Sequence, residues 1–209
     1  MAVEVTAQQV KELRDQTGAG FQDCRKALLE NDGDVTKAIE YLRKKGIATA
    51  GKKAGRVAKE GVIQGYMHHN GRLGVLVEVN SETDFVARNE LFQKFAKDLA
   101  LHIANTAPRY LRREDVPQAD VEKERSVQRE KTLNEGKKEA VVDKIVDGRM
   151  DKWYEEIVLL EQPWLHDDKL KVGDVLTQLI SEIKENIVIR RFSRFALGEE
   201  SSADEGQSE

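Results

Sequence analysis

The 209-residue chain contains few of the residues that cross-link or stiffen a fold: one cysteine, three prolines and 6% aromatic residues. The single cysteine, Cys24, excludes an internal disulfide and favours a reducing compartment. Long hydrophobic runs are also missing, because no apolar stretch approaches the roughly 18 residues that span a bilayer. The N-terminus has no basic segment followed by an apolar one. We therefore expect a cytoplasmic protein without a membrane segment.

The chain also lacks a basic charge balance. Acidic residues outnumber basic ones, 38 to 34, and the net charge is −4. A general nucleic-acid binder normally presents a basic face, so we expect no direct nucleic-acid binding, although the 34 Lys and Arg residues could cluster locally. The 34% charged residues are typical of a soluble, helix-rich protein with one substantial domain and a small one.

Helix signals dominate the first part of the chain. Thr6 and Gln9 have the spacing of a capping box, and Gly18 suits the end of that helix. A second helix is expected over 21–30, and Asp34 caps a third, which we expect to end at Gly46. Three short helices predict a compact bundle whose core is marginal, so it suits docking better than chemistry. The small and basic residues that follow predict a mobile linker, and a partly helical linker stays open.

An apolar hairpin should open the next region. Asn70-Gly71 lies between apolar runs, and both residues tolerate the positive φ of a type I′ turn. A helix carrying Phe92, Leu99 and Ile103 should pack across the hairpin. The sequence from 110 to 152 is highly charged and interrupted by Gly136, which predicts two antiparallel helices in a projecting arm.

The remaining segments complete an α+β fold. We expect a short strand over 154–160, a helix over 176–183 and a last strand over 187–195 in a small, mostly antiparallel sheet packed by helices. The expected organisation is a three-helix docking module at 1–46, a linker at 47–60, a core domain in two parts at 61–109 and 153–198, a charged helical hairpin at 110–152, and a disordered acidic tail at 199–209.

No residues assemble into an active site. Gly51-Lys52-Lys53 lacks the spacing of a phosphate-binding loop. His68 and His69 should point to opposite faces of a strand and cannot easily share a metal, and Cys24 has no histidine nearby to activate it. We therefore predict a binding protein with no catalytic residue, metal or cofactor.

The stretch Thr83-Asp84-Phe85-Val86 is the most informative motif. It places a carboxylate beside a large aromatic ring on a turn, between the apolar strand 74–79 and an amphipathic helix. Recognition residues are often held on such turns by rigid elements. The alternative is that Phe85 is a core residue, which is the commoner fate of an aromatic side chain after a strand.

Four segments resemble the elongation factor Ts family, in the right order from about residue 4 to residue 198. The segments are Lys11–Leu28, Gly74–Ala87, Asp147–Met150 and Gln162-Pro163. The resemblance implies a guanine-nucleotide exchange factor that binds elongation factor Tu in its GDP-bound and nucleotide-free forms.

The resemblance also implies roles for particular residues. The first three helices would form a ubiquitin-associated-like bundle that docks through Arg14, Phe21 and Gln22. The motif Thr83–Val86 would displace Mg²⁺ from the partner, with Asp84 and Phe85 pushing between two of its helices. Larger members of the family carry two related core halves and this chain has room for one, so we expect a homodimer.

Two other interpretations remain open from the residues alone. The basic linker and the charged arm would permit a ribosome- or RNA-associated structural protein, which should bind RNA in a salt-sensitive way. A ubiquitin-associated-type adaptor, whose larger domain binds an unrelated client, is the second. Neither would accelerate GDP release from a GTPase.

Overall fold

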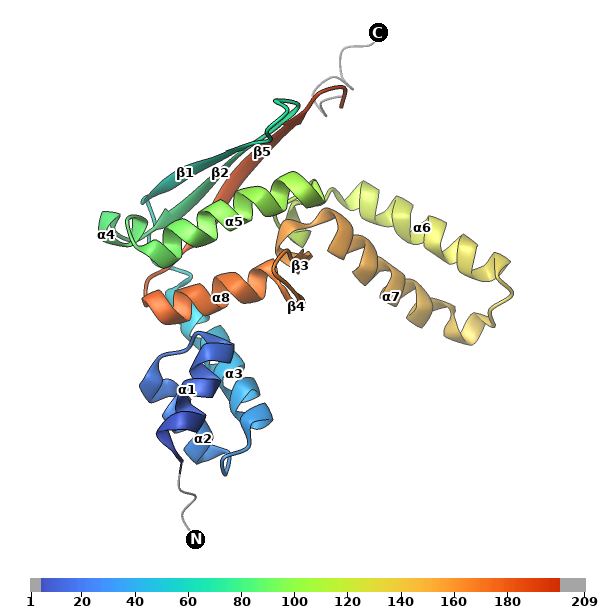
Figure 1. Cartoon of the computed structure of the whole chain (residues 1–209). Coiled ribbons are helices and arrows are strands. Elements are labelled where there is room, and N and C mark those ends of the chain that lie inside the picture. The colour runs from blue at the N-terminus through green and yellow to red at the C-terminus, as the bar shows by residue number, and fades with distance from the viewer. Residues whose placement is uncertain (1–4, 200–209) are drawn as a thin grey trace. The chain divides into compact units, whose positions relative to one another are not determined.

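The computed structural model describes residues 5–199, which form an α+β fold with a small antiparallel sheet, as predicted (Figure 1). The helices are α1 (Ala7–Thr17), α2 (Phe21–Glu30), α3 (Val35–Lys53), α4 (Asp84–Ala87), α5 (Glu90–Thr106), α6 (Gln118–Asn134), α7 (Glu139–Ile157) and α8 (Val172–Ile183), with 3₁₀ turns at Arg113–Asp115 and Leu159–Glu161. The strands are β1 (Glu60–Met67), β2 (Leu73–Ser81), β3 (Pro163–Trp164), β4 (Asp167–Lys171) and β5 (Val188–Ala196). No helix within residues 5–199 is long and apolar enough to cross a membrane. The acidic tail was predicted at 199–209, and all of it after Glu199 lies outside the described residues.

The chain divides into two compact units. The first contains the described residues up to Ile63, with Glu78–Ala96 and Asp174–Arg190; the second contains Gln64–Val77, Lys97–Gly173 and the described residues from Arg191 onward. The strands of the main sheet and helix α5 contribute residues to both units.

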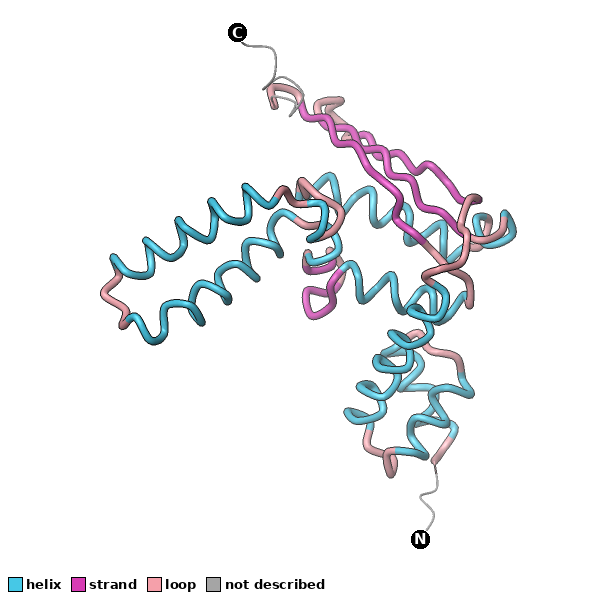
Figure 2. The backbone as a smooth tube through the Cα atoms, turned by 180° about the vertical axis from the view of Figure 1, so that it is seen from behind, coloured by secondary structure: helices cyan, strands magenta, loops and turns pink. Residues whose placement is uncertain are grey.

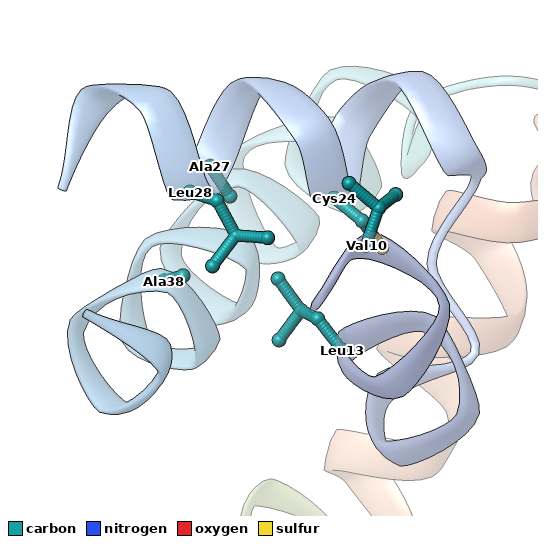
Figure 3. Close-up of a cluster of buried hydrophobic side chains, with 6 residues drawn as sticks. All are labelled: Val10, Leu13, Cys24, Ala27, Leu28 and Ala38. Atoms are coloured by element: carbon teal, nitrogen blue, oxygen red, sulfur yellow. The ribbon is translucent and has the colours of Figure 1, made fainter. Parts of the chain in front are cut away.

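The three-helix bundle of the first unit forms as its capping residues predict. The Gln9 backbone N–H donates to Thr6 Oγ1 at 3.2 Å and the Thr6 N–H donates to Gln9 Oε1 at 2.9 Å, which completes the capping box. Gly18 ends α1 in the left-handed region, with φ 65°. Figure 3 shows the small core gathered between the three helices, made of Val10, Leu13, Cys24, Ala27, Leu28 and Ala38.

Helix α3 does not end at Gly46, as the sequence suggested, but continues to Lys53. Glycine inside a helix costs only about 1 kcal/mol relative to alanine, which a helix of 19 residues tolerates. Lys52 and Lys53 lie in the last turn, where positive charge interacts favourably with the helix dipole. The first half of the expected linker is therefore helical.

The main sheet has the strand order β1-β2-β5. The His68 N–H donates to the Leu73 carbonyl and the Leu197 N–H donates to the Arg72 carbonyl, both at 2.9 Å, so β2 is antiparallel to both neighbours. Along β2, Val75 and Val77 are buried and the intervening Leu76 is 53% exposed. One face of the strand therefore belongs to the core and the other is open.

The turn between β1 and β2 differs from the type I′ turn expected at Asn70-Gly71. Gly71 has a positive φ of 68° and Asn70 does not. The Gly71 N–H donates to the His68 carbonyl at 2.8 Å, and Asn70 Oδ1 accepts from the Arg72 N–H at 3.0 Å. The loop is therefore of the longer kind, in which a turn is followed by one left-handed residue.

Helices α6 and α7 lie side by side in the second unit and form the predicted helical hairpin (Figures 1 and 2). Gly136 has a φ of 75° in the connecting loop. Arg149 donates to Thr132 Oγ1 at 3.1 Å and pairs with Glu135 at 2.7 Å, which joins the two helices near the loop.

The strand expected over 154–160 is wrong, because α7 continues to Ile157 and a 3₁₀ turn follows. The helical spacing of the buried residues Val142, Val146 and Met150 continues to Ile157, inside this segment. A short apolar run cannot be distinguished from a buried strand by periodicity alone. The strands that do form here, β3 and β4, pair antiparallel through Pro163–Lys171 and Trp164–Asp167.

Gln162 organises a buried polar network in the second unit. Its Oε1 accepts from Thr106 Oγ1 at 2.8 Å and lies 3.0 Å from His102 Nε2, and its Nε2 donates to the Glu156 carbonyl at 2.9 Å. Since Oε1 can only accept, Nε2 of His102 carries a proton, and in the neutral imidazole Nδ1 does not. Nδ1 is buried and has no hydrogen-bond partner among the described residues. The imidazole also stacks on Trp164, with ring centroids 5.4 Å apart.

This geometry predicts a loss of stability in mild acid. Burial lowers the pKa of His102 below its ordinary value, and the nearby His166 acts in the same direction. The unfolded chain, whose histidine titrates near 6.5, therefore binds more protons, and stability falls as the pH drops below about 6.5, by at most about 1.4 kcal/mol per unit. Urea unfolding at pH 7.5 and 5.5 measures this. His102→Gln, which cannot titrate, should show a smaller pH dependence; an equal dependence in both proteins would contradict the assignment.

Candidate functional site

The motif Thr83–Val86 lies where β2 ends and the four-residue helix α4 begins. The sequence predicted a turn, and the structure shows one helical turn capped by Thr83, whose Oγ1 accepts from the Val86 N–H at 3.4 Å. The side chain of Phe85 is 80% exposed. The alternative interpretation, in which Phe85 is a core residue, is therefore excluded for this chain.

Thr83 is tied to the first unit through all of its polar groups. Its N–H donates to Glu185 Oε2 at 3.1 Å and its hydroxyl donates to Glu185 Oε1 at 2.8 Å. Its carbonyl accepts from Ser81 Oγ at 2.8 Å, and Ser81 is fully buried. Thr83, two positions before Phe85, thus has a fixed orientation.

A second set of contacts fixes the preceding residue. Glu82 Oε1 accepts from the Asn186 N–H at 2.6 Å, and Arg56 lies 3.4 Å from Glu82 Oε2. The Asn186 N–H and the Arg56 charge hold the pKa of the Glu82 carboxyl below its ordinary value. Asn186 Nδ2 also donates to the Arg56 carbonyl at 2.8 Å.

Asp84 lies beside Phe85 and keeps its carboxylate near solvent. It pairs with Arg88 one helical turn later at 2.9 Å, and the two side chains are 48% and 79% exposed. Exposed pairs of this kind are worth little, so a partner can compete for either group. Val86 is half-buried and Ala87 is buried, which leaves Phe85 as the prominent apolar group of α4.

The three predicted docking residues lie around the turn between α1 and α2. Arg14 is exposed in the last turn of α1, and Phe21 and Gln22 are exposed in the first turn of α2. Phe21 is 45% exposed while Cys24, on the same helix, is buried. These residues and the Thr83–Val86 motif therefore occupy different elements of the first unit. No group of three or more His, Cys, Asp or Glu side chains within residues 5–199 could hold a metal ion.

Sequence patterns did not identify Glu185, which holds the motif. The residue follows α8 and is 102 positions from Thr83 along the chain. A lone carboxylate after a helix has no periodicity or spacing that distinguishes it from a solvated one. Only the fold shows what it contacts.

Comparison with known proteins decides the family. A family model described as "Elongation factor TS" matches residues 3–199. The chain belongs to the elongation factor Ts family. Membership places it among the translation elongation factors of protein biosynthesis.

Individual relatives match over almost their whole length. Elongation factor Ts of Alkaliphilus oremlandii is 56% identical over 197 residues, which cover 94% of this chain and 91% of that protein. The protein of the same name from Carboxydothermus hydrogenoformans is 56% identical over 93% of this chain and 90% of its own length. That of Thermoanaerobacter sp. strain X514 is 55% identical over 96% of this chain and 100% of its own length. The match therefore includes the bundle, the sheet and the helical hairpin.

Proposed function

We propose that the protein is a guanine-nucleotide exchange factor for elongation factor Tu, acting by protein–protein binding and not as an enzyme. It binds the GDP form and promotes GDP release, so that GTP can bind. The observation that carries the proposal is the side chain of Phe85, 80% exposed beside Asp84 on a turn tied through Thr83, in a member of the elongation factor Ts family. A large exposed aromatic side chain on a rigid element is suited to insertion into a partner.

The mechanism needs only a small displacement in the partner. GDP is held by Mg²⁺, which bridges a phosphate oxygen to the protein, and by backbone amides and a lysine around the phosphates. Insertion of Phe85 and Asp84 between two helices of the partner would shift both the Mg²⁺ site and the phosphate-binding loop. Burial of a Phe side chain is worth about 1.5–3 kcal/mol, which corresponds to about one to two powers of ten in rate.

The three-helix bundle would supply further binding energy. Arg14, Phe21 and Gln22 are exposed together around the turn between α1 and α2, where they can contact the nucleotide domain of the partner. Arginine and aromatic residues are enriched at protein–protein interfaces. Contacts that do not change during GDP release anchor the complex without accelerating the step.

Linkage explains how the factor leaves the complex. A factor that weakens the binding of GDP must itself be weakened by GDP to the same extent, so rebinding of nucleotide expels it. The factor therefore accelerates exchange in both directions and sets no preference. An excess of GTP over GDP would drive the net reaction.

The test is release of fluorescent GDP from elongation factor Tu in a stopped-flow instrument, against excess unlabelled GDP. We expect the protein to accelerate release by about tenfold or more. Chelation of Mg²⁺ with EDTA should raise the basal rate and shrink this acceleration, because both act on the same site. No acceleration, together with salt-sensitive RNA binding or capture of an unrelated client, would support one of the two alternatives instead.

An apolar groove in the second unit supports a homodimer. Its volume is about 690 Å³, and the β1–β2 hairpin and the end of β5 line it. Met67, Leu76, Phe195 and Leu197 in this groove are 70%, 53%, 70% and 67% exposed. Soluble monomers rarely leave a contiguous patch of this kind uncovered. We propose a second copy of the chain as its occupant, since larger family members carry two core halves and this chain carries one.

A further inference from the structure

Two short segments of the first unit are joined by a reciprocal pair of hydrogen bonds, each from a backbone N–H to a carboxylate of the other segment. Glu82 accepts the backbone N–H of Asn186, and Glu185 accepts the backbone N–H of Thr83. Each segment therefore supplies an acceptor to the other, at 2.6 and 3.1 Å. We call these four residues the carboxylate clamp. Hydrogen bonds from backbone N–H groups to ionised carboxylates are among the stronger ones in proteins.

Glu185 does more than tie the backbone, because its second oxygen accepts the proton of the Thr83 hydroxyl at 2.8 Å. A hydroxyl has one proton and two lone pairs. With the proton directed at Glu185, a lone pair of Oγ1 is available to the Val86 N–H, 3.4 Å away. The carboxylate thus orients the cap that begins α4.

Helix α4 depends on such ties. A single helical turn is unstable in isolation, because nucleation fixes several residues for one hydrogen bond. Of its four residues, Ala87 is the buried one, and Phe85 is 80% exposed. The direction in which α4 presents Phe85 is therefore set at its ends: by the clamp at Thr83 and by Gln93, which donates to the Ala87 carbonyl.

The segment that carries Glu185 is itself under local strain. Lys184, the residue after α8, has a φ of 67°, a left-handed conformation that is unfavourable for residues other than glycine. Its N–H donates to the Ile180 carbonyl at 3.0 Å, and its carbonyl accepts from Lys53. This conformation turns the chain so that the next residue reaches Thr83. Strained backbone of this kind clusters at functional sites.

We propose that Glu185 is a positioning residue for nucleotide exchange, which it serves by holding Thr83 and thereby aiming Phe85. The proposal rests on the exchange function proposed above. It assigns no contact with the partner to Glu185. Its effect on exchange must consequently pass through Phe85, and this separates positioning from a general role in folding.

The test measures GDP release from elongation factor Tu at saturating factor for the parent, Glu185→Ala, Phe85→Ala and the double variant. Glu185→Ala should lower the maximal rate by about fivefold to tenfold, since two charge-assisted hydrogen bonds are lost. The factor concentration for half-maximal effect should change by less than about twofold, because docking is untouched. In the Phe85→Ala background the same substitution should lower the rate by less than about twofold. Glu185→Gln keeps one acceptor oxygen and should be intermediate.

A matched control removes a carboxylate elsewhere. Glu130 is exposed on α6, and Glu130→Gln should leave the rate unchanged. Hydrogen–deuterium exchange of the protein alone gives a second reading: Glu185→Ala should raise exchange of the amides of 83–88 and leave those of α1–α3 unchanged.

An equal loss of rate in the parent and Phe85→Ala backgrounds would overturn the proposal, because Glu185 would then act through folding. Unchanged rates together with unchanged amide protection would also overturn it. Failure of the exchange function can be distinguished from failure of this proposal. In that case the parent itself would not accelerate GDP release, and the amide protection of 83–88 would still show whether the clamp holds α4.

Discussion

Phe85→Ala should lower the rate of GDP release from elongation factor Tu by about tenfold or more, with little change in the stability of the factor itself. The ring is 80% exposed, so its truncation removes little buried area from the folded chain, and the free energy of unfolding should change by less than about 0.5 kcal/mol. In the complex the same ring would be buried, and its loss would remove about 1.5–3 kcal/mol, or one to two powers of ten. Stopped-flow release of fluorescent GDP and urea unfolding measure the two quantities.

Phe92 offers a matched control seven residues further on. Its side chain is fully buried on α5, so Phe92→Ala should destabilise the fold by about 3–5 kcal/mol through the cavity it leaves. The two substitutions remove the same atoms from a buried and an exposed position. A large loss of stability in Phe85→Ala, or an unchanged release rate, would contradict the proposed role of Phe85.

Local chemistry made much of the fold predictable. The capping box at Thr6, the glycine at 18 and the interruption at Gly136 each define a helix end by a backbone requirement within a few residues. Errors arose where local preference was ambiguous. Gly46 tolerates either a helix end or a helix interior, and the apolar run 157–160 suits a strand or a buried helix end.

The candidate functional site was predictable only in part. The motif Thr83–Val86 was recognisable because its residue types and its place after a strand are sequence properties, and the exposure of Phe85 agrees with that interpretation. The contacts that hold the motif in place were not recognisable from the sequence. Glu82 and Glu185 contact residues more than 100 positions away, so their pairing is a property of the fold and not of a local pattern.

The apolar groove leads to the second large expected effect, on assembly. In a symmetric dimer the same patch lies on both sides of the interface, so one substitution changes it twice. Phe195 lines the groove, and its side chain is 70% exposed. It is therefore the residue to substitute. Replacement by lysine removes the burial of two rings, worth at least about 1.5 kcal/mol each, and the sum of about 3 kcal/mol corresponds to about a hundredfold weaker dimer.

We therefore expect the parent chain to sediment as a dimer at micromolar concentration and Phe195→Lys to sediment as a folded monomer. Leu133→Lys is the matched control, because Leu133 is a 40% exposed apolar residue on α6, outside the groove; it should remain dimeric. A monomeric parent, or a Phe195→Lys protein that stays dimeric, would contradict the assignment of this face. The groove lies in the second unit and Phe85 in the first. If one copy of the factor is enough for exchange, monomeric Phe195→Lys should therefore accelerate GDP release as the parent does. Loss of exchange with loss of the dimer would instead show that two copies act on the partner together.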